Sequence, residues 1–157
     1  MTRQELVELL DDLADTPAGI GRVISTMTIQ DLTRKPSANQ FSVLESVCHL
    51  RDIEREGYAV RIEKLLNETK PLLPDLDGAR LAAERDYNSQ DFRAAFDEFA
   101  SARESNVHKL REATLEQLES RGMFEGVGEV TLERLLELMR EHDAGHLQEL
   151  RTLCASV

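Results

Sequence analysis

Cysteines, basic residues and long apolar runs are all scarce in this chain of 157 residues. No apolar run reaches the roughly 18 residues that a transmembrane helix requires, and the first residues enter an amphipathic pattern without the apolar core of a signal peptide. We therefore expect a cytoplasmic protein with no membrane partner. The two cysteines, Cys48 and Cys154, lie in apolar helical stretches. A free cysteine there behaves as a small buried hydrophobe, and no disulfide is expected.

Positive charge is in deficit, with 19 Lys and Arg residues against 30 Asp and Glu residues and a formal net charge of -11. A chain this acidic gains nothing by neutralising phosphates, so we expect no nucleic-acid partner. Proline and glycine are also sparse, at 4 and 8 residues, while charged residues make up 31%. This composition and this length predict a single soluble globular domain over residues 1–157.

Helical periodicity is the pattern that the sequence does contain, in four segments. Apolar residues recur there at the spacing of one helix face, over about 2–27, 42–66, 88–110 and 131–154. Thr2 and Ser42 are each followed three residues later by a glutamate, which is the pattern of a capping box at a helix start. Proline lacks a backbone donor, so Thr16-Pro17 predicts a kink or a restart in the first helix.

The links between these segments predict how the helices are connected. Residues 28–40 are polar and form a connection, and residues 68–88 and 115–130 form two longer ones. Part of the second link, 78–85, fits a short helix, and the glycines of the third allow tight turns. No strand alternation is visible. The sequence therefore predicts an all-α four-helix bundle in which long crossover links join parallel neighbours.

Two of the four histidines are spaced as metal ligands on the last predicted helix. His142 and His146 lie one turn apart on the same face, at positions where the apolar stripe would otherwise have leucine. Burying two imidazoles without partners costs about 1–3 kcal/mol for each unsatisfied group, and a shared cation removes that cost. His49 lies on a second stripe of the second predicted helix with Ile53 and Val60. The fourth, His108, lies among polar residues and is expected in solvent.

A third ligand from a neighbouring helix would complete a site of catalytic type. Three protein ligands leave one position of a tetrahedral ion open for water or substrate. His49 is the candidate for that third ligand, and Asp52, three residues further on, is a candidate to orient a histidine ring through a hydrogen bond. The alternative is that the three histidines are core residues without a metal.

The motifs around these histidines resemble those of the DinB-like (DinB/YfiT-like) metal-binding four-helix bundles. Residues 41–50, where an aromatic residue and a serine precede His49 and Leu50, look like the signature of the family's second helix. Phe41 stands where the family often has tryptophan. Residues 83–88 are similar to a segment before the third helix in one branch, and residues 131–147 to the signature of the fourth helix.

This resemblance implies that His49, His142 and His146 bind one divalent metal ion, commonly zinc or nickel, with water completing the site. It also implies up-down-down-up topology and a homodimer. Some members of the family are S-transferases that use a low-molecular-weight thiol, others are described as metal-dependent hydrolases, and many have no known activity.

Such a site is consistent with three functions. The first two act on a small-molecule substrate, and the third needs none. The first is a metal-dependent transferase, in which a low-molecular-weight thiol cosubstrate attacks a small electrophile as its thiolate. The second is hydrolysis by metal-bound water, with Glu45, Asp52 or Glu141 as candidate general base. The third is a metal-binding stress or interaction protein without catalysis. The sequence identifies no catalytic residue beyond the ligands and does not separate zinc from nickel.

Overall fold

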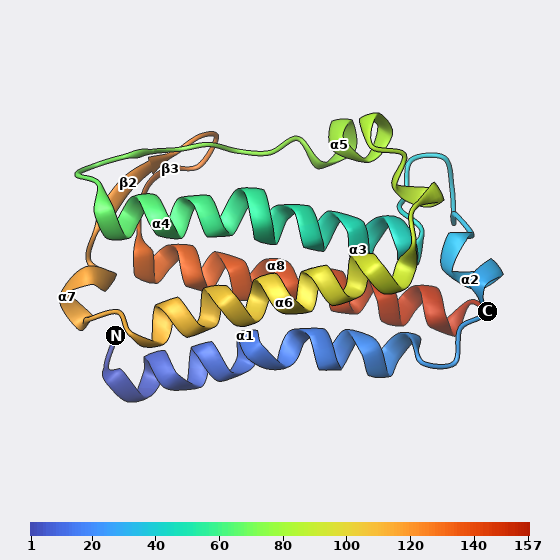
Figure 1. The fold of residues 1–157 in the computed structure, drawn as a ribbon, viewed down its shortest axis with the longest axis horizontal. Helices are drawn as coiled ribbons and strands as arrows, with labels where there is room; N and C mark the ends of the chain where they lie inside the picture. The colour runs from blue at the N-terminus through green and yellow to red at the C-terminus, as the bar shows by residue number, and fades with distance from the viewer.

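The computed structural model describes all 157 residues, Met1–Val157, and consists mainly of four long helices that lie side by side (Figure 1). The helices are α1 (Arg3–Ile24), the composite of α3 (Val43–Asp52), η1 (Ile53–Tyr58) and α4 (Ala59–Asn67), α6 (Phe92–Arg111) and α8 (Leu132–Ala155). Shorter helices in the links are α2 (Ile29–Thr33), α5 (Gly78–Glu84), η2 (Tyr87–Ser89) and α7 (Leu115–Leu118). No helix combines the length and the apolar character needed to cross a membrane.

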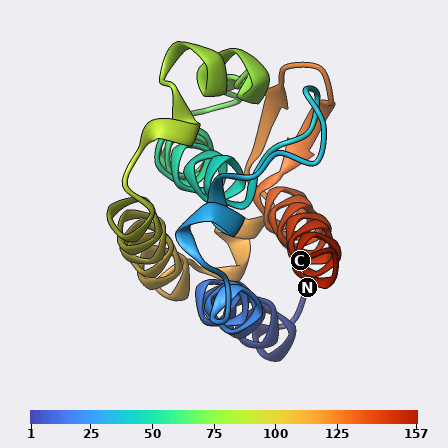
Figure 2. The same ribbon diagram turned by 90° about the vertical axis from the view of Figure 1, so that its right-hand side faces the viewer.

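The four long helices follow the predicted up-down-down-up course (Figure 1). α1 and α8 run in one direction, and the α3–α4 helix and α6 run in the other, so the link between α4 and α6 crosses the length of the bundle. The link between α6 and α8 stays at one end. Viewed along the bundle, the helices form a ring in the order α1, α6, α3 and α8 (Figure 2).

Three of the four neighbouring pairs in this ring pack closely, and the fourth does not. The α3–α6, α1–α8 and α1–α6 pairs form extensive contacts, whereas α3 and α8 contact each other least. Two buried apolar clusters fill the bundle, one towards each end of the helices. We call the thinly packed line between α3 and α8 the α3–α8 seam.

The first helix is continuous through Pro17, so the helix does not restart there, which was one of the two predicted outcomes. A proline leaves the carbonyl four residues before it without its helical donor. That carbonyl belongs to Leu13, and the buried guanidinium of Arg103 on α6 donates to it through Nη1 at 2.8 Å. A side chain from a neighbouring helix therefore replaces the bond that the proline removes, which the local sequence does not reveal.

The second long helix contains one π-helical stretch, η1, which the periodicity did not predict. The backbone N–H of Ala59 bonds to the carbonyl of Glu54, five residues earlier. This wider turn places Ile53, Glu54, Gly57 and Tyr58 all inside the molecule. It also ends the expected stripe of His49, Ile53 and Val60, because Val60 is turned towards solvent with 36% of its surface exposed.

A small three-stranded sheet closes one end of the bundle and corrects the expectation of a protein without strands. β1 (Leu72–Leu73) pairs in parallel with β2 (Arg121–Phe124), which forms an antiparallel hairpin with β3 (Gly128–Thr131). The hairpin turn uses Gly126 and Gly128 at φ of 77° and 110°, as the glycine content of this link suggested. Strands of two and four residues are too short to produce a clear alternation, and the apolar residues of their buried face are Leu73, Phe124 and Val130.

Candidate metal centre

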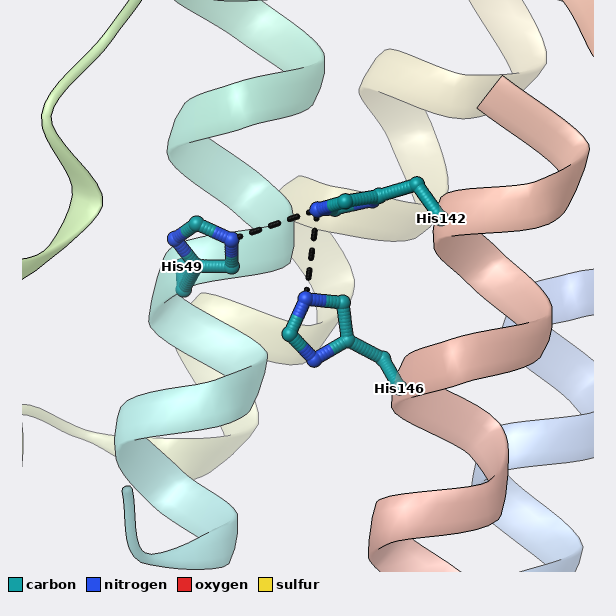
Figure 3. Close-up of side chains that lie close together, drawn as sticks. All are labelled: His49, His142 and His146. Atoms are coloured by element: carbon teal, nitrogen blue, oxygen red, sulfur yellow. Dashed lines mark hydrogen bonds between the residues drawn. The ribbon is translucent and has the colours of Figure 1, made fainter. Parts of the chain in front are cut away.

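The three predicted ligands meet at the α3–α8 seam (Figure 3). His49 projects from α3, and His142 and His146 project from successive turns of α8. The Nε2 atom of His142 lies 3.4 Å from Nε2 of His49 and 3.2 Å from Nε2 of His146. All three ligand atoms lie within 4.8 Å of one another. The fourth histidine, His108, is exposed at 79% of its side chain, as predicted.

The neutral state of His49 and His142 at pH 7 favours binding of a cation. Burial, followed by the charge that His146 and His142 would carry, lowers the pKa of His49 to about 3. Burial, followed by His146 and Arg103, lowers the pKa of His142 to about 3. Both rings are therefore neutral at pH 7 and each keeps a free lone pair. Neutral imidazole is the form that binds metal.

Two of the three nitrogen–nitrogen distances match those expected around one tetrahedral ion. Two nitrogens bound at about 2.05 Å from such an ion lie about 3.3 Å apart, close to the 3.4 and 3.2 Å distances from His142. The Nδ1 atoms of all three rings have no hydrogen-bond partner in the protein. The Nε2 atoms have no partners except one another, at the two distances given above. A cation bound between the three Nε2 atoms would take the place of these ring-to-ring contacts.

The rings are enclosed by aromatic side chains and by the start of α5. The ring of Phe41 lies 5.6 Å from that of His49, and the ring of Tyr58 meets that of His142 edge-on at 6.0 Å. Gly78, the first residue of α5, covers His49 so closely that an added Cβ would lie 2.7 Å from its Cε1 atom. The long link between α4 and α6 thus forms one wall of the site.

Asp52 does not orient a histidine, which corrects its predicted role. Its carboxylate is buried and accepts hydrogen bonds from Arg51 Nε at 2.7 Å, Arg85 Nη1 at 2.7 Å and Tyr87 Oη at 2.6 Å. These bonds attach α5 and η2 to α3. With 30 acidic residues in the chain, nearness in sequence was a weak signal. The carboxylate that does approach a histidine ring is that of Glu149. Its Oε2 atom lies 3.1 Å from Nδ1 of His146, although the geometry is not that of a hydrogen bond.

The two other acidic candidates are also engaged away from the cluster. Glu45 accepts from the backbone N–H of Ser42 at 2.8 Å and from Lys35 Nζ at 3.0 Å. Glu141 is exposed and bonds to Arg134 at 2.9 Å on the outer face of α8. Neither carboxylate faces the open side of the three histidines as a free base.

A buried ionic network that the sequence pattern did not reveal includes Asp143, the residue that follows His142. Arg103 is 1% exposed and donates to Asp143 at 2.6 Å and to Glu54 at 2.9 Å. Asn106 also donates to Glu54, and Thr16 to Asp143, each at 2.8 or 2.9 Å. The network pairs two carboxylates with one guanidinium, and the charge of Arg103 is one of the causes that lower the pKa of His142. Burial of these residues depends on tertiary packing, so local periodicity gave no sign of it.

Fold and cluster together define a class: a four-helix bundle with three convergent histidines that could hold one metal ion. The chain belongs to the DinB superfamily, whose family model matches residues 1–150. A similar solved structure is that of YfiT from Bacillus subtilis, described as a probable metal-dependent hydrolase with an unusual four-helix bundle topology. It shares 19% sequence identity at a TM-score of 0.91, covering 99% of this chain and 89% of that one. No curated protein matches the sequence.

Proposed function

We propose that the protein is a metal-dependent enzyme in which His49, His142 and His146 bind one divalent ion, zinc or nickel. The observation that carries this proposal is the convergence of three Nε2 atoms, two of the distances being 3.2 and 3.4 Å. A bound divalent ion would supply positive charge that lowers the pKa of a thiol or a water molecule in the open position. The histidines hold the ion, and Phe41, Tyr58 and the start of α5 shield it from bulk solvent.

A thiol transfer is the reaction that this set of side chains supports best. Hydrolysis by activated water generally uses a nearby general base, and Glu45, Asp52 and Glu141 are all engaged with other partners. A thiol needs less help, because its ordinary pKa of about 8.5 is already close to neutrality. The thiol would lose its proton to solvent, its sulfur would bond to the electrophilic carbon, and the leaving group would depart with the bonding electrons.

Hydrolysis is the second candidate, because the structurally similar YfiT is described as a probable metal-dependent hydrolase. A direct comparison separates the two. The metal-loaded protein is incubated with a generic aryl electrophile and each of several small thiols, and separately with a model ester without thiol. We expect thiol-dependent conjugation that His142→Ala abolishes. Ester hydrolysis without thiol would favour the second candidate instead.

Metal binding itself is tested first, by elemental analysis after reconstitution with Zn²⁺ or Ni²⁺. We expect about one equivalent per chain in the wild type, and a loss of at least tenfold in affinity for His49→Ala, His142→Ala or His146→Ala. His108→Ala is the matched control, because its ring is exposed on α6 and should leave binding unchanged. Less than a tenth of an equivalent in the wild type would contradict the proposal. If metal binding raises the melting temperature but neither conjugation nor ester hydrolysis is detected, the protein is a metal-binding protein without these catalytic activities.

A further inference from the structure

A cavity of about 590 Å³ adjoins the histidine cluster along the α3–α8 seam. It lies between the start of α3, the last turns of α8, the start of α5 and the loop before α3. Figure 2 shows the end of the bundle at which these segments lie. Its volume is in the range of small-molecule pockets. The lining residues that matter here are Phe41, Ser46, Ala79, Glu149, Thr152 and Leu153.

The cavity is one helical turn away from the three rings. Ser46 precedes His49 by three residues on α3, and Glu149 follows His146 by three residues on α8, so each shares a helix face with its histidine. The ring of Phe41 lies 5.6 Å from that of His49, and Oε2 of Glu149 lies 3.1 Å from Nδ1 of His146. A molecule in this cavity therefore contacts the same side chains that enclose two of the three histidines.

Ser46 presents an unused polar group to the cavity. The residue is only 2% exposed, and its hydroxyl lines the cavity without a hydrogen bond to any protein group. A ligand or a water molecule in the cavity can therefore bond to it as donor or acceptor. On the other side, Phe41 and Leu153 offer apolar surface for the body of a ligand.

The charge of the cavity selects the class of ligand. Glu149 is the one charged residue among those lining it. Arg34 and Lys35 line the adjacent cavity and bond to the Ser156 carbonyl and to Glu45. In a chain of net charge -11, an ammonium group in this cavity would be attracted by the Glu149 carboxylate, whereas an anion would be repelled by it.

We propose that this cavity is the substrate pocket of the histidine site and that it takes a small molecule with a cationic amine and an apolar body. Glu149 pairs with the amine, Ser46 bonds to a polar group, and Phe41 packs against the apolar part. The role as a substrate pocket rests on the proposed function above, whereas the selectivity for amines rests on the cavity alone.

Three matched probes test the selectivity: phenethylamine, phenethyl alcohol and 3-phenylpropionate, which share one aromatic body and differ in charge. Binding to the full chain, with and without Zn²⁺, is followed by titration of backbone amide NMR signals. We expect the amine to bind about tenfold more tightly than the carboxylate, with the largest shifts at residues 46, 79 and 149. Because Glu149 is 66% exposed, we expect Glu149→Gln to weaken amine binding by about three- to fivefold.

Glu137→Gln is the matched control, an exposed glutamate on the same helix that lies away from the cavity, and should leave all three affinities unchanged. Phe41→Leu should weaken the three probes equally. Equal binding of amine and carboxylate, shifts centred elsewhere, or an unchanged preference in Glu149→Gln would overturn the proposal. Metal content is measured separately. Selective amine binding by a protein that takes up no metal would contradict the proposed metal-dependent function and support the amine pocket. Metal binding without selective amine binding would support the metal site and contradict the amine pocket.

Discussion

Gly78 helps to fix the position of the His49 ring. The ring nitrogen Nδ1 has no hydrogen-bond partner, Nε2 lies 3.4 Å from Nε2 of His142, and the start of α5 packs closely against the ring. A side chain at this position would occupy the space of the ring, since a Cβ would lie 2.7 Å from Cε1 and 2.8 Å from Nδ1.

Gly78→Ala should therefore weaken metal binding without removing any ligand. Either His49 moves away from the other two histidines or α5 lifts from the seam, and we expect a loss of about tenfold or more in affinity for Zn²⁺. A competition titration against a chromophoric chelator measures it. Gly145→Ala, next to His146 but with nothing within 4 Å of an added Cβ, should bind as the wild type does. Equal affinity in the two variants would contradict this account of His49.

Single residues were predictable where their chemistry was unusual for their position. His142 and His146 interrupt a leucine stripe, and the structure brings both to His49. Asp52 and Glu149 are acidic residues in a chain with 30 of them, so neither was distinctive. Whether Asp52 or Glu149 approaches a histidine depends on which side of α3 and of α8 faces the seam. The π-helical turn that follows Asp52 could not be predicted from the sequence.

At the scale of elements, α5 is attached to the bundle by polar contacts more than by its own apolar surface. Asp52 on α3 accepts from Arg85 at the end of α5 and from Tyr87 in η2. Burial opposes the charge of this carboxylate, but hydrogen bonds from Arg51, Tyr87 and Arg85 outweigh it and lower its pKa. The ionised form is thus favoured in the native state.

Asp52→Asn should destabilise the protein by about 2 kcal/mol at pH 7, because an amide replaces the charged acceptor of three bonds. A carboxylate with a lowered native pKa stabilises the fold above its unfolded pKa of about 3.9, and this contribution is lost as the pH falls through the native pKa. The difference between variant and wild type in urea unfolding should therefore shrink below pH 4. Asp97→Asn, at an exposed position of α6, is the control. A difference independent of pH would refute the assignment.

The long helices could be predicted because their apolar stripes extend over many turns, whereas irregular elements could not. Capping boxes at Thr2 and Ser42 mark real helix starts. The π-helical turn of η1 inserts one residue into a pattern that assumes 3.6 residues per turn. The continuity of α1 at Pro17 depends on Arg103, 86 residues later in the sequence, and no local rule anticipates a donor at that distance.

For the molecule as a whole, Arg103 is the point at which all four long helices meet. From α6 it bonds to Leu13 on α1, to Glu54 in η1 and to Asp143 on α8. Its removal leaves two buried carboxylates without their cation. Breaking a buried ion pair in this way costs about 3–5 kcal/mol.

Arg103→Met should accordingly lower the free energy of unfolding by about 3–5 kcal/mol, measured by urea denaturation. The triple variant Arg103→Met, Glu54→Gln, Asp143→Asn should recover part of this loss, because it removes the unpaired charges as well. Arg93→Met, at an exposed site on the same helix, should be close to neutral. A triple variant no more stable than the single one would show that lost packing, and not unpaired charge, dominates.

Because packing at the α3–α8 seam is thin, the residues that stabilise the fold differ from those proposed to contact a ligand. Stability comes from the three closely packed helix pairs and from the Arg103 network, while His49, Ser46, His146 and Glu149 line the fourth side. Substitutions along that side change the chemistry presented to a ligand while the main core is left intact. The seam positions can therefore be varied to change which ligands the bundle binds at little cost in stability, and a library of variants at these positions would be a practical starting point for doing so.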